Sequence, residues 1–327
     1  MILAKGITQY GFQGRLKAEF PSQIIVDATE VCNLSCIHCP HSEFKRSGNY
    51  GARYLDVKLH HKMVDEVREY GQGNTQYIRY TSNGEPLIHP YIYDMLDYAV
   101  KRSNVFVTLT TNGTIMNQKR IESLLESGLH MVDISIDAFL PETYAKIRRG
   151  GNLKITRANV LKLIEIRKQI GATTKIVVSF IEQSQNKNEA KEFENYWEKQ
   201  GVDFVVIRRL HSAAGGVAVI AKDMKINQQS EIRKPCLYPW ERILLSPKGE
   251  LAFCPQDWVH GSVLADYHTT TIRQVWLGYS YQQLRSAHLT NDFKLFPFCA
   301  QCPDWAQTRW PGDGKSYADL VSHFFKE

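Results

Sequence analysis

The sequence predicts an α/β fold: a partial barrel of six βα units followed by a smaller cysteine-rich module. Between residues 23 and 210, short runs rich in β-branched residues alternate with amphipathic segments, which is typical of parallel βα units. Six strands are too few to close an eight-stranded (β/α)8 barrel, so we expect an open one. After Leu210 this alternation stops, and Cys, Trp and Pro become frequent.

The elements of the barrel are expected in a regular order, with one helix between each strand and the next. The expected strands are Gln23–Ala28, Gln76–Thr81, Val105–Thr110, Met131–Ile136, Lys175–Phe180 and Phe204–Arg209. The expected helices are Val57–Tyr70, Tyr91–Lys101, Gln118–Ser127, Ile155–Gln169 and Asn188–Lys199.

The C-terminal part is expected to contain a β-hairpin and no long periodic helix. Two short strand-like runs, Ile243–Ser246 and Leu251–Cys254, flank a turn that contains Gly249. A short helix, Ser316–Phe325, is expected near the end of the chain. We therefore divide the chain into an extension (1–22), the barrel (23–215), a metal-organised module (216–310) and a terminal helix (311–327).

Composition excludes several classes of protein. The 327 residues are 43% hydrophobic and 23% charged, which is typical of a globular protein. No apolar run is long enough to span a bilayer, and the 40 Lys and Arg residues are too scattered to indicate nucleic-acid binding. The N-terminus lacks the apolar core of a signal peptide, so we expect a cytoplasmic protein. In that reducing setting, the seven cysteines are expected to be metal ligands or catalysts rather than disulfides.

The first cysteine cluster follows the first strand directly, in the order Cys32-Asn-Leu-Ser-Cys36-Ile-His-Cys39. Active sites of barrels gather at the carboxyl ends of strands, and thiolates suit zinc or iron–sulfur clusters. Three cysteines leave one coordination position open. Structural zinc needs four protein ligands, and His38 could be the fourth only with considerable strain, because it lies between two of the cysteines.

This spacing resembles the Cys-x3-Cys-x2-Cys signature of the radical S-adenosylmethionine (SAM) superfamily. The resemblance implies that Cys32, Cys36 and Cys39 hold three irons of a [4Fe–4S] cluster and that SAM chelates the fourth iron. It also implies that reduction of SAM yields methionine and a 5′-deoxyadenosyl radical.

Other residues at the expected strand ends agree with this resemblance. Asn83-Gly84-Glu85-Pro86 resembles the family's Gly-Gly-Glu-Pro element, in which Gly84 would let the backbone approach the methionyl amine and Glu85 would accept from it. An ordinary Asn-Gly turn is the alternative. Short polar residues at strand ends are also common helix caps. The further candidate SAM contacts are His38, Thr111, Asn112, Ser135, Asp137 and Ser179.

The remaining cysteines are Cys236, Cys254, Cys299 and Cys302. From spacing alone, zinc and an iron–sulfur cluster are equally plausible for such a set. In the context of the superfamily, the set resembles the shortened SPASM, or twitch, module. That resemblance implies one auxiliary [4Fe–4S] cluster, ligated completely by protein.

The resemblance extends to 2-deoxy-scyllo-inosamine dehydrogenase-type enzymes. It implies oxidation of a small polar substrate, a sugar or aminocyclitol alcohol, to a ketone, with the auxiliary cluster accepting an electron. Arg208 or Arg209, together with Tyr144, are the candidate substrate or base contacts, and strand alternation lets only one of the two arginines point inward. The family's reductant is flavodoxin or ferredoxin. Epimerisation, peptide modification and a zinc-stabilised binding module without chemistry remain the alternatives.

Overall fold

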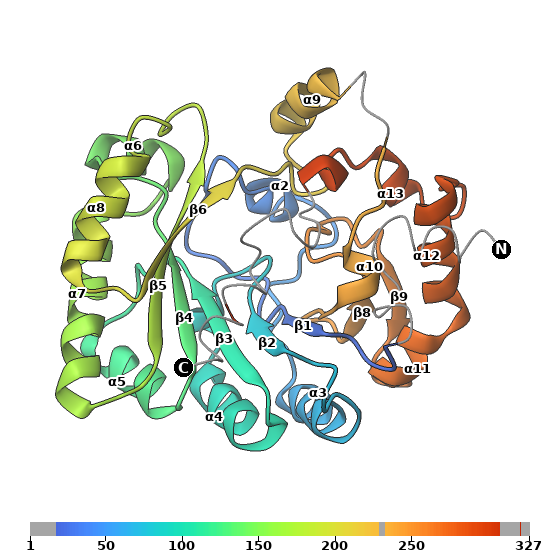
Figure 1. Ribbon diagram of the computed structural model, residues 1–327, viewed down its shortest axis with the longest axis horizontal. Coiled ribbons are helices and arrows are strands. Elements are labelled where there is room, and N and C mark those ends of the chain that lie inside the picture. The colour runs from blue at the N-terminus through green and yellow to red at the C-terminus, as the bar shows by residue number, and fades with distance from the viewer. Residues whose placement is uncertain (1–17, 229–232, 308–320, 322–327) are drawn as a thin grey trace.

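The computed structural model describes residues 18–228, 233–307 and 321, and its core is one sheet of nine strands. The strands lie in the order β6-β5-β4-β3-β2-β1-β7-β8-β9 (Figure 1). Neighbours from β6 to β7 are parallel, whereas β7, β8 and β9 pair in antiparallel fashion. The first six strands in the chain form the partial barrel, and the last three extend its sheet into the C-terminal part.

The barrel elements agree with the prediction to within two residues at every boundary. Its strands are β1 (Gln23–Val26), β2 (Tyr77–Tyr80), β3 (Phe106–Thr111), β4 (Met131–Ser135), β5 (Lys175–Glu182) and β6 (Phe204–Arg209). Its long helices are α3 (Val57–Tyr70), α4 (Ile92–Ser103), α5 (Gln118–Glu126), α7 (Leu153–Ile170) and α8 (Ala190–Gln200). Shorter helical turns that were not predicted are α2 (His41–Phe44), the 3-10 helix η2 (Pro86–Ile88) and α6 (Pro141–Ile147).

Local capping explains why these helices begin and end where they do. The Asp56 carboxylate accepts hydrogen bonds from the first free backbone N–H groups of α3, and the Asn152 side chain does the same for α7. Helices α7 and α8 end at Gly171 and Gly201, whose φ angles of 67° and 85° lie in the left-handed region that glycine adopts without strain.

Alternation along the strands separates two layers. One set of side chains, which includes Ile78, Val107 and Val132, packs under the helices in the largest hydrophobic cluster. The opposite set faces the inside of the barrel, where an apolar floor is closed by Val321. Val321 is a helical residue of the predicted segment Ser316–Phe325, the rest of which lies outside the described residues. The floor residues that share one hydrophobic cluster with Val321 are Tyr77, Phe106, Met131 and Val177.

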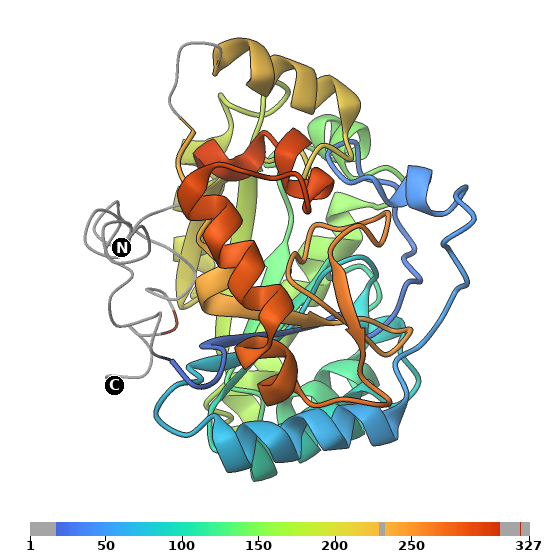
Figure 2. The same cartoon turned by 90° about the vertical axis from the view of Figure 1, so that its right-hand side faces the viewer.

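The C-terminal part continues the sheet because β7 (Arg242–Leu245) pairs in parallel with β1. The predicted hairpin is confirmed: β7 pairs with β8 (Glu250–Ala252) across a turn in which Gly249 has a φ of 79°. A third strand, β9 (Val263–Asp266), was not predicted. Figure 2 turns this part toward the viewer. Its helices are α9 (Ala218–Asn227), α10 (Tyr238–Glu241), α11 (Ile272–Leu277), α12 (Tyr279–Thr290), α13 (Pro297–Gln301) and the 3-10 helix η3 (Asp304–Gln307).

The expectation of no long helix after Leu210 is wrong. Helix α12 has twelve residues and buries Tyr281, Leu284, Ala287 and His288. Two of these four carry polar atoms, so the buried stripe gives a weak apolar periodicity in the sequence.

In the described part of the chain, no helix is both long and apolar enough to cross a membrane.

A buried carboxylate fastens the C-terminal part to the barrel. Glu66 of α3 accepts hydrogen bonds from the Tyr267 hydroxyl at 2.6 Å and from the backbone N–H of Ile272 at 2.8 Å. Both partners lie beyond β9, so a single side chain joins segments about two hundred residues apart.

We expect Glu66→Ala to destabilise the protein by about 2 kcal/mol, because it leaves two buried donors without an acceptor. Urea unfolding followed by circular dichroism should show a lower midpoint than the parent. Glu69→Ala is the matched control, since Glu69 lies on the exposed side of the same helix. Equal midpoints for the two variants would contradict the assigned role of Glu66.

Candidate functional site

Three of the seven cysteines lie on the loop between β1 and α2. Cys32, Cys36 and Cys39 are partly buried and not joined in disulfides. The loop after α6 holds them in place, because backbone N–H groups on either side of Cys36 donate to carbonyl oxygens at residues 147 and 149, at 3.0 and 2.9 Å. The Cys39 N–H donates to the Cys36 carbonyl at 3.2 Å. The loop conformation is therefore determined by the barrel.

These three thiols suit a cationic metal centre. Burial raises the pKa of Cys32 to about 12, and burial also raises the pKa values of Cys36 and Cys39. Each thiol would stay protonated at neutral pH unless a cation stabilised its thiolate. The described residues contain no group of three or more His, Cys, Asp or Glu side chains arranged around a single metal ion. Three soft donors on one loop fit a polynuclear iron–sulfur cluster.

A buried ion pair lies behind the cysteine loop. Arg148 donates through Nε to the Asp137 carboxylate at 2.8 Å, and both side chains are almost completely buried. The guanidinium also hydrogen-bonds to Cys36. His38 lies against the same pair, 3.6 Å from the Asp137 carboxylate, and burial lowers the pKa of His38 to about 4. His38 is thus a buried neutral side chain rather than a solvent-exposed loop residue.

The loop after β2 packs against the segment that leads to the cysteines. A Cβ atom on Gly84 would lie 1.9 Å from the Thr29 carbonyl oxygen and 2.8 Å from that of Val31, which explains the glycine. The Glu85 N–H donates to the Val31 carbonyl at 2.9 Å. In this structure Gly84 therefore allows two backbone segments to approach each other closely. The sequence did not indicate this reason for a glycine.

Glu85 is also committed to the protein itself. Its carboxylate accepts from the Thr111 hydroxyl at 2.6 Å and from the Asn112 N–H at 2.7 Å, and it caps η2 at Leu87. The Asn112 side chain in turn donates to Asn33 in the cysteine loop at 2.9 Å. These bonds join the ends of β2 and β3 to the cysteine loop. Glu85 thus stabilises the site by joining these loops, and both of its carboxylate oxygens already accept hydrogen bonds from the protein.

The inside of the barrel above its apolar floor is polar. Asp133 is completely buried and accepts from Arg208 at 2.7 Å and from Arg79 at 3.4 Å. Nearby in the sheet, Ser135 and Ser179 are register partners whose hydroxyl oxygens lie 3.4 Å apart. Two arginines and one carboxylate thus line the lumen, beside a pair of hydroxyls.

The structure separates the catalytic candidates. Arg208 points into the lumen, whereas Arg209 is exposed at the end of β6. The hydroxyl of Tyr144 lies 2.9 Å from the Thr156 hydroxyl and is completely buried, so Tyr144 is positioned to pack rather than to meet a substrate. Sequence reasoning missed Arg79 and Asp133. The alternation that placed one of Arg208 and Arg209 inside would have found both, since each lies on an inward position of its strand.

The other four cysteines lie close together in the C-terminal part. Cys236 precedes α10, Cys254 follows β8, Cys299 is in α13 and Cys302 caps that helix. Burial raises the pKa of Cys302 to about 12, and the pKa values of Cys254 and Cys299 are raised for the same reason. The four sulfur atoms also influence one another electrostatically. This all-sulfur set fits a fully protein-ligated iron–sulfur cluster.

Two contacts tie this cysteine quartet to the barrel. The Asp304 carboxylate, two residues after Cys302, accepts from the Ser212 N–H and hydroxyl and from the Ala214 N–H at 2.6 to 2.8 Å. Trp258, on the loop after Cys254, packs on Phe44 with ring centres 5.7 Å apart, in a cluster that includes Cys39. Residues next to one cysteine group therefore contact residues next to the other.

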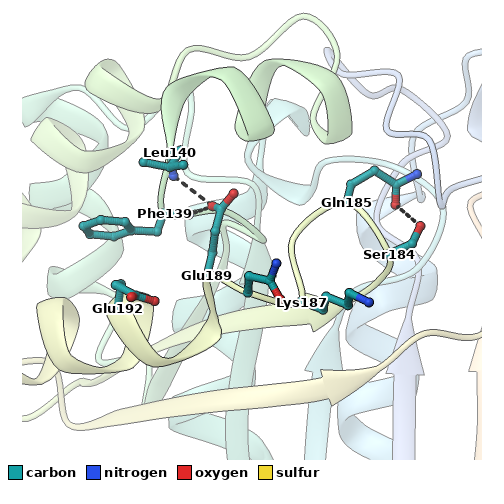
Figure 3. Close-up of a pocket in the computed structure, with 8 residues that line it drawn as sticks. Phe139, Leu140, Ser184, Gln185, Lys187, Glu189 and Glu192 are labelled. Carbon is teal, nitrogen blue, oxygen red and sulfur yellow. Dashed lines mark hydrogen bonds between the residues drawn. The ribbon is translucent and has the colours of Figure 1, made fainter.

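A surface pocket lies elsewhere, between the start of α6 and the start of α8 (Figure 3). The Glu189 carboxylate closes one side by accepting from the N–H groups of Phe139 and Leu140 at 2.7 and 2.9 Å. None of the seven cysteines lines this pocket, so it forms no part of the candidate site.

Two family models match the chain. The model of the radical SAM superfamily matches residues 26–190, and that of the SPASM iron–sulfur cluster-binding domain matches residues 236–303. Together they include all seven cysteines.

Curated relatives are similar over the barrel. A probable GTP 3′,8-cyclase of Methanococcus maripaludis is 28% identical over 179 residues, which is 55% of this chain and 56% of the relative. A tungsten-containing aldehyde ferredoxin oxidoreductase cofactor-modifying protein of Pyrococcus furiosus is 26% identical over 189 residues, or 57% of this chain and 51% of that protein. The chain thus spans about half the length of these relatives.

Solved structures are similar over nearly the whole chain. BtrN in complex with AdoMet and 2-DOIA has a TM-score of 0.56 at 16% identity, covering 86% of this chain and 92% of BtrN. Streptococcus suis SuiB bound to the precursor peptide SuiA has a TM-score of 0.62 at 13% identity, covering 98% of this chain and 76% of SuiB. At these identities the likeness concerns the fold.

We expect Gly84→Ala to lower reductive cleavage of SAM about a hundredfold, because the added Cβ would push the segment before Cys32 away by about 1 Å. Iron content and 5′-deoxyadenosine formation with dithionite measure the effect. Gly48→Ala is the matched control, since a Cβ at Gly48 meets nothing within 4 Å. Parent-like cleavage by Gly84→Ala would show that this backbone contact is not needed.

Proposed function

This chain belongs to the radical SAM superfamily and carries a SPASM iron–sulfur domain, and from that premise we propose that it oxidises an alcohol group of a sugar or aminocyclitol to a ketone. The superfamily binds SAM through a [4Fe–4S] cluster, and the SPASM domain adds auxiliary iron–sulfur binding. The observation that carries the proposal is the division of the seven cysteines into three on the barrel loop and four in the C-terminal part.

In the proposed assignment, Cys32, Cys36 and Cys39 hold the SAM-binding cluster, and the four C-terminal cysteines hold one auxiliary cluster. Three thiolates leave one iron open for SAM, whereas four leave none open for substrate. When bound, these groups supply one-electron chemistry: cleavage of SAM to a radical that abstracts hydrogen, and uptake of the second electron from the substrate. The auxiliary domain is proposed to span 216–310, next to a barrel at 23–215.

The barrel residues that we propose as SAM contacts fall into two groups. Ser135 and Ser179 offer hydroxyls at the ends of adjacent strands and suit direct hydrogen bonds to the methionyl group or ribose. The other candidates act on SAM through the loops that they shape, and the side chains of Glu85, Thr111 and Asp137 already bond to the protein. These are His38, Asn83, Gly84, Glu85, Pro86, Thr111, Asn112 and Asp137.

Arg208 is our candidate for contact with the substrate. Its side chain is 24% exposed while it is bound to Asp133, so part of the guanidinium can meet a ligand in the lumen. The carboxylate fixes its orientation, and the guanidinium can donate to the substrate oxygen from which a proton is lost. Arg79, held by Thr110 and Asp133, can support the same oxygen. The proposed partners are thus a small polar substrate and, as reductant, flavodoxin or ferredoxin.

Peptide modification is the second candidate. The observation that favours it is the likeness to SuiB, solved with its precursor peptide, over 98% of this chain. The oxidation of a small molecule is preferred because the four C-terminal cysteines suffice for one auxiliary cluster, as in the shortened module that the sequence resembles.

We expect anaerobically reconstituted protein to bind about eight irons, because two cubane clusters hold four each. Changing Cys32, Cys36 and Cys39 together to Ala should leave about four irons and abolish SAM cleavage. Iron assay and electron paramagnetic resonance (EPR) spectroscopy measure both. Stoichiometric zinc in place of iron would refute the proposal and favour a zinc-stabilised binding module.

We expect turnover in deuterium oxide to give a product lighter than the substrate by the mass of two hydrogen atoms, after exchangeable deuterium has been washed out with water. Oxidation removes one carbon-bound and one hydroxyl hydrogen and returns neither. An epimerase would instead leave one deuterium at the inverted carbon, and a product of that mass would rule out oxidation. 5′-Deoxyadenosine should form in equal amount with product.

A further inference from the structure

Arg233 is a half-buried arginine beside the cysteine quartet. Its Nη2 donates to the Cys299 carbonyl oxygen at 2.6 Å, and its Nη1 donates to that of Ala300 at 3.0 Å. The guanidinium lies 4.2 Å from the centre of the Phe293 ring, a cation–π contact. These contacts fix the charged group against α13, which carries Cys299.

The electrostatic partners of this guanidinium are sulfur atoms. Cys302, Cys299 and Cys236 all interact electrostatically with Arg233, while its buried Nε–H has no hydrogen-bond partner among the residues that the structure describes. Two carboxylates also interact electrostatically with cysteines of the quartet, Asp257 with Cys299 and Asp304 with Cys302. Asp257 accepts from backbone N–H groups of its own loop, and Asp304 accepts from those of Ser212 and Ala214.

The guanidinium keeps its charge in this position. Burial lowers the pKa of Arg233, and the cysteines raise it. Since the pKa of a free arginine lies far above neutrality, the group stays protonated. The neighbouring His288 accepts from the Cys236 N–H at 3.2 Å.

We propose that Arg233 is the counter-cation of the auxiliary cluster, a positioning residue that holds a positive charge near the thiolates of Cys236, Cys299 and Cys302 and raises the reduction potential of the cluster. Four thiolates make such a site negatively charged, and uptake of an electron adds to that charge. A fixed positive charge in a low-dielectric interior therefore stabilises the reduced form more than the oxidised form. The inference rests on the proposed function, in which this cluster accepts an electron from the substrate.

The arginine at the other cysteine group is arranged differently. Arg148 hydrogen-bonds to Cys36, but its charge is offset by the buried Asp137 carboxylate at 2.8 Å. Within the described residues, the two Nη atoms of Arg233 donate to uncharged carbonyl oxygens. At the barrel site the charge of the arginine is paired with a carboxylate, whereas at the auxiliary site it is bonded to uncharged carbonyl groups. This difference favours electron uptake at the auxiliary site.

The test measures the reduction potential of the auxiliary cluster in the full-length chain. A background with Cys32, Cys36 and Cys39 changed to Ala leaves that cluster as the one redox centre of the proposed assignment. EPR-monitored titration then compares Arg233→Gln and Arg233→Lys with this background. We expect a shift to more negative potential in Arg233→Gln and a smaller shift in Arg233→Lys, which keeps the charge.

Lys234→Gln is the matched control, because it removes the same charge from the adjacent exposed residue, where water screens it. Its potential should equal that of the background. An unchanged potential in Arg233→Gln at full iron content would overturn the proposal.

If Arg233→Gln fails to bind iron, Arg233→Met and Arg233→Lys decide the question. Iron retained by Lys but lost with Met supports a requirement for charge, whereas loss in both, or retention in both at equal potential, overturns it. No substrate enters this measurement. Failure of the oxidation proposal would therefore leave its result intact, and failure of the Arg233 proposal would leave the mass-spectrometric test of oxidation standing.

Discussion

The position of β1 between the other barrel strands and the C-terminal strands is the constraint on which the rest of the structure depends. This strand pairs with β2 on one side and with β7 on the other, and all three run parallel. Its carboxyl end leads directly into the loop that carries Cys32, Cys36 and Cys39. Because β7 begins six residues after Cys236 and continues through the hairpin toward Cys254, the same pairing sets the two cysteine groups relative to each other.

Hydrogen bonds to backbone groups then fix the loops that this sheet brings together. Glu85, Glu66 and Asp304 are carboxylates that accept from N–H groups of segments distant in the sequence, and each joins two loops or two parts of the chain. Donors that meet a carboxylate in this way fix its orientation and keep its oxygens hydrogen-bonded after burial. These three residues thus fix the positions of the loops and take no direct part in the proposed chemistry.

Charge inside the molecule is concentrated where chemistry is proposed. The outer layer of the barrel is apolar and packs under helices, and the floor of the lumen is apolar as well. Between the floor and the cysteine loop lie Arg79, Asp133 and Arg208, and each cysteine group has one buried or half-buried arginine in contact with it. Burying charged groups is costly even when they are paired, so their presence at these positions supports the proposed site.

The sequence by itself determined the alternation of strands and helices, the six barrel strands and the division of the cysteines into two groups. These features follow from local patterns, namely the periodicity of apolar residues and the spacing of ligands. It also predicted the hairpin around Gly249. Tertiary structure alone decided which of Arg208 and Arg209 faces the lumen, and it showed that Tyr144 is buried against Thr156 and that Gly84 is needed for contact with Thr29. The pairing of β1 with β7 and the placement of Arg233 on α13 were likewise not predictable. Each depends on contacts between residues far apart in the chain, and such contacts produce no repeating pattern of apolar and polar residues in the sequence.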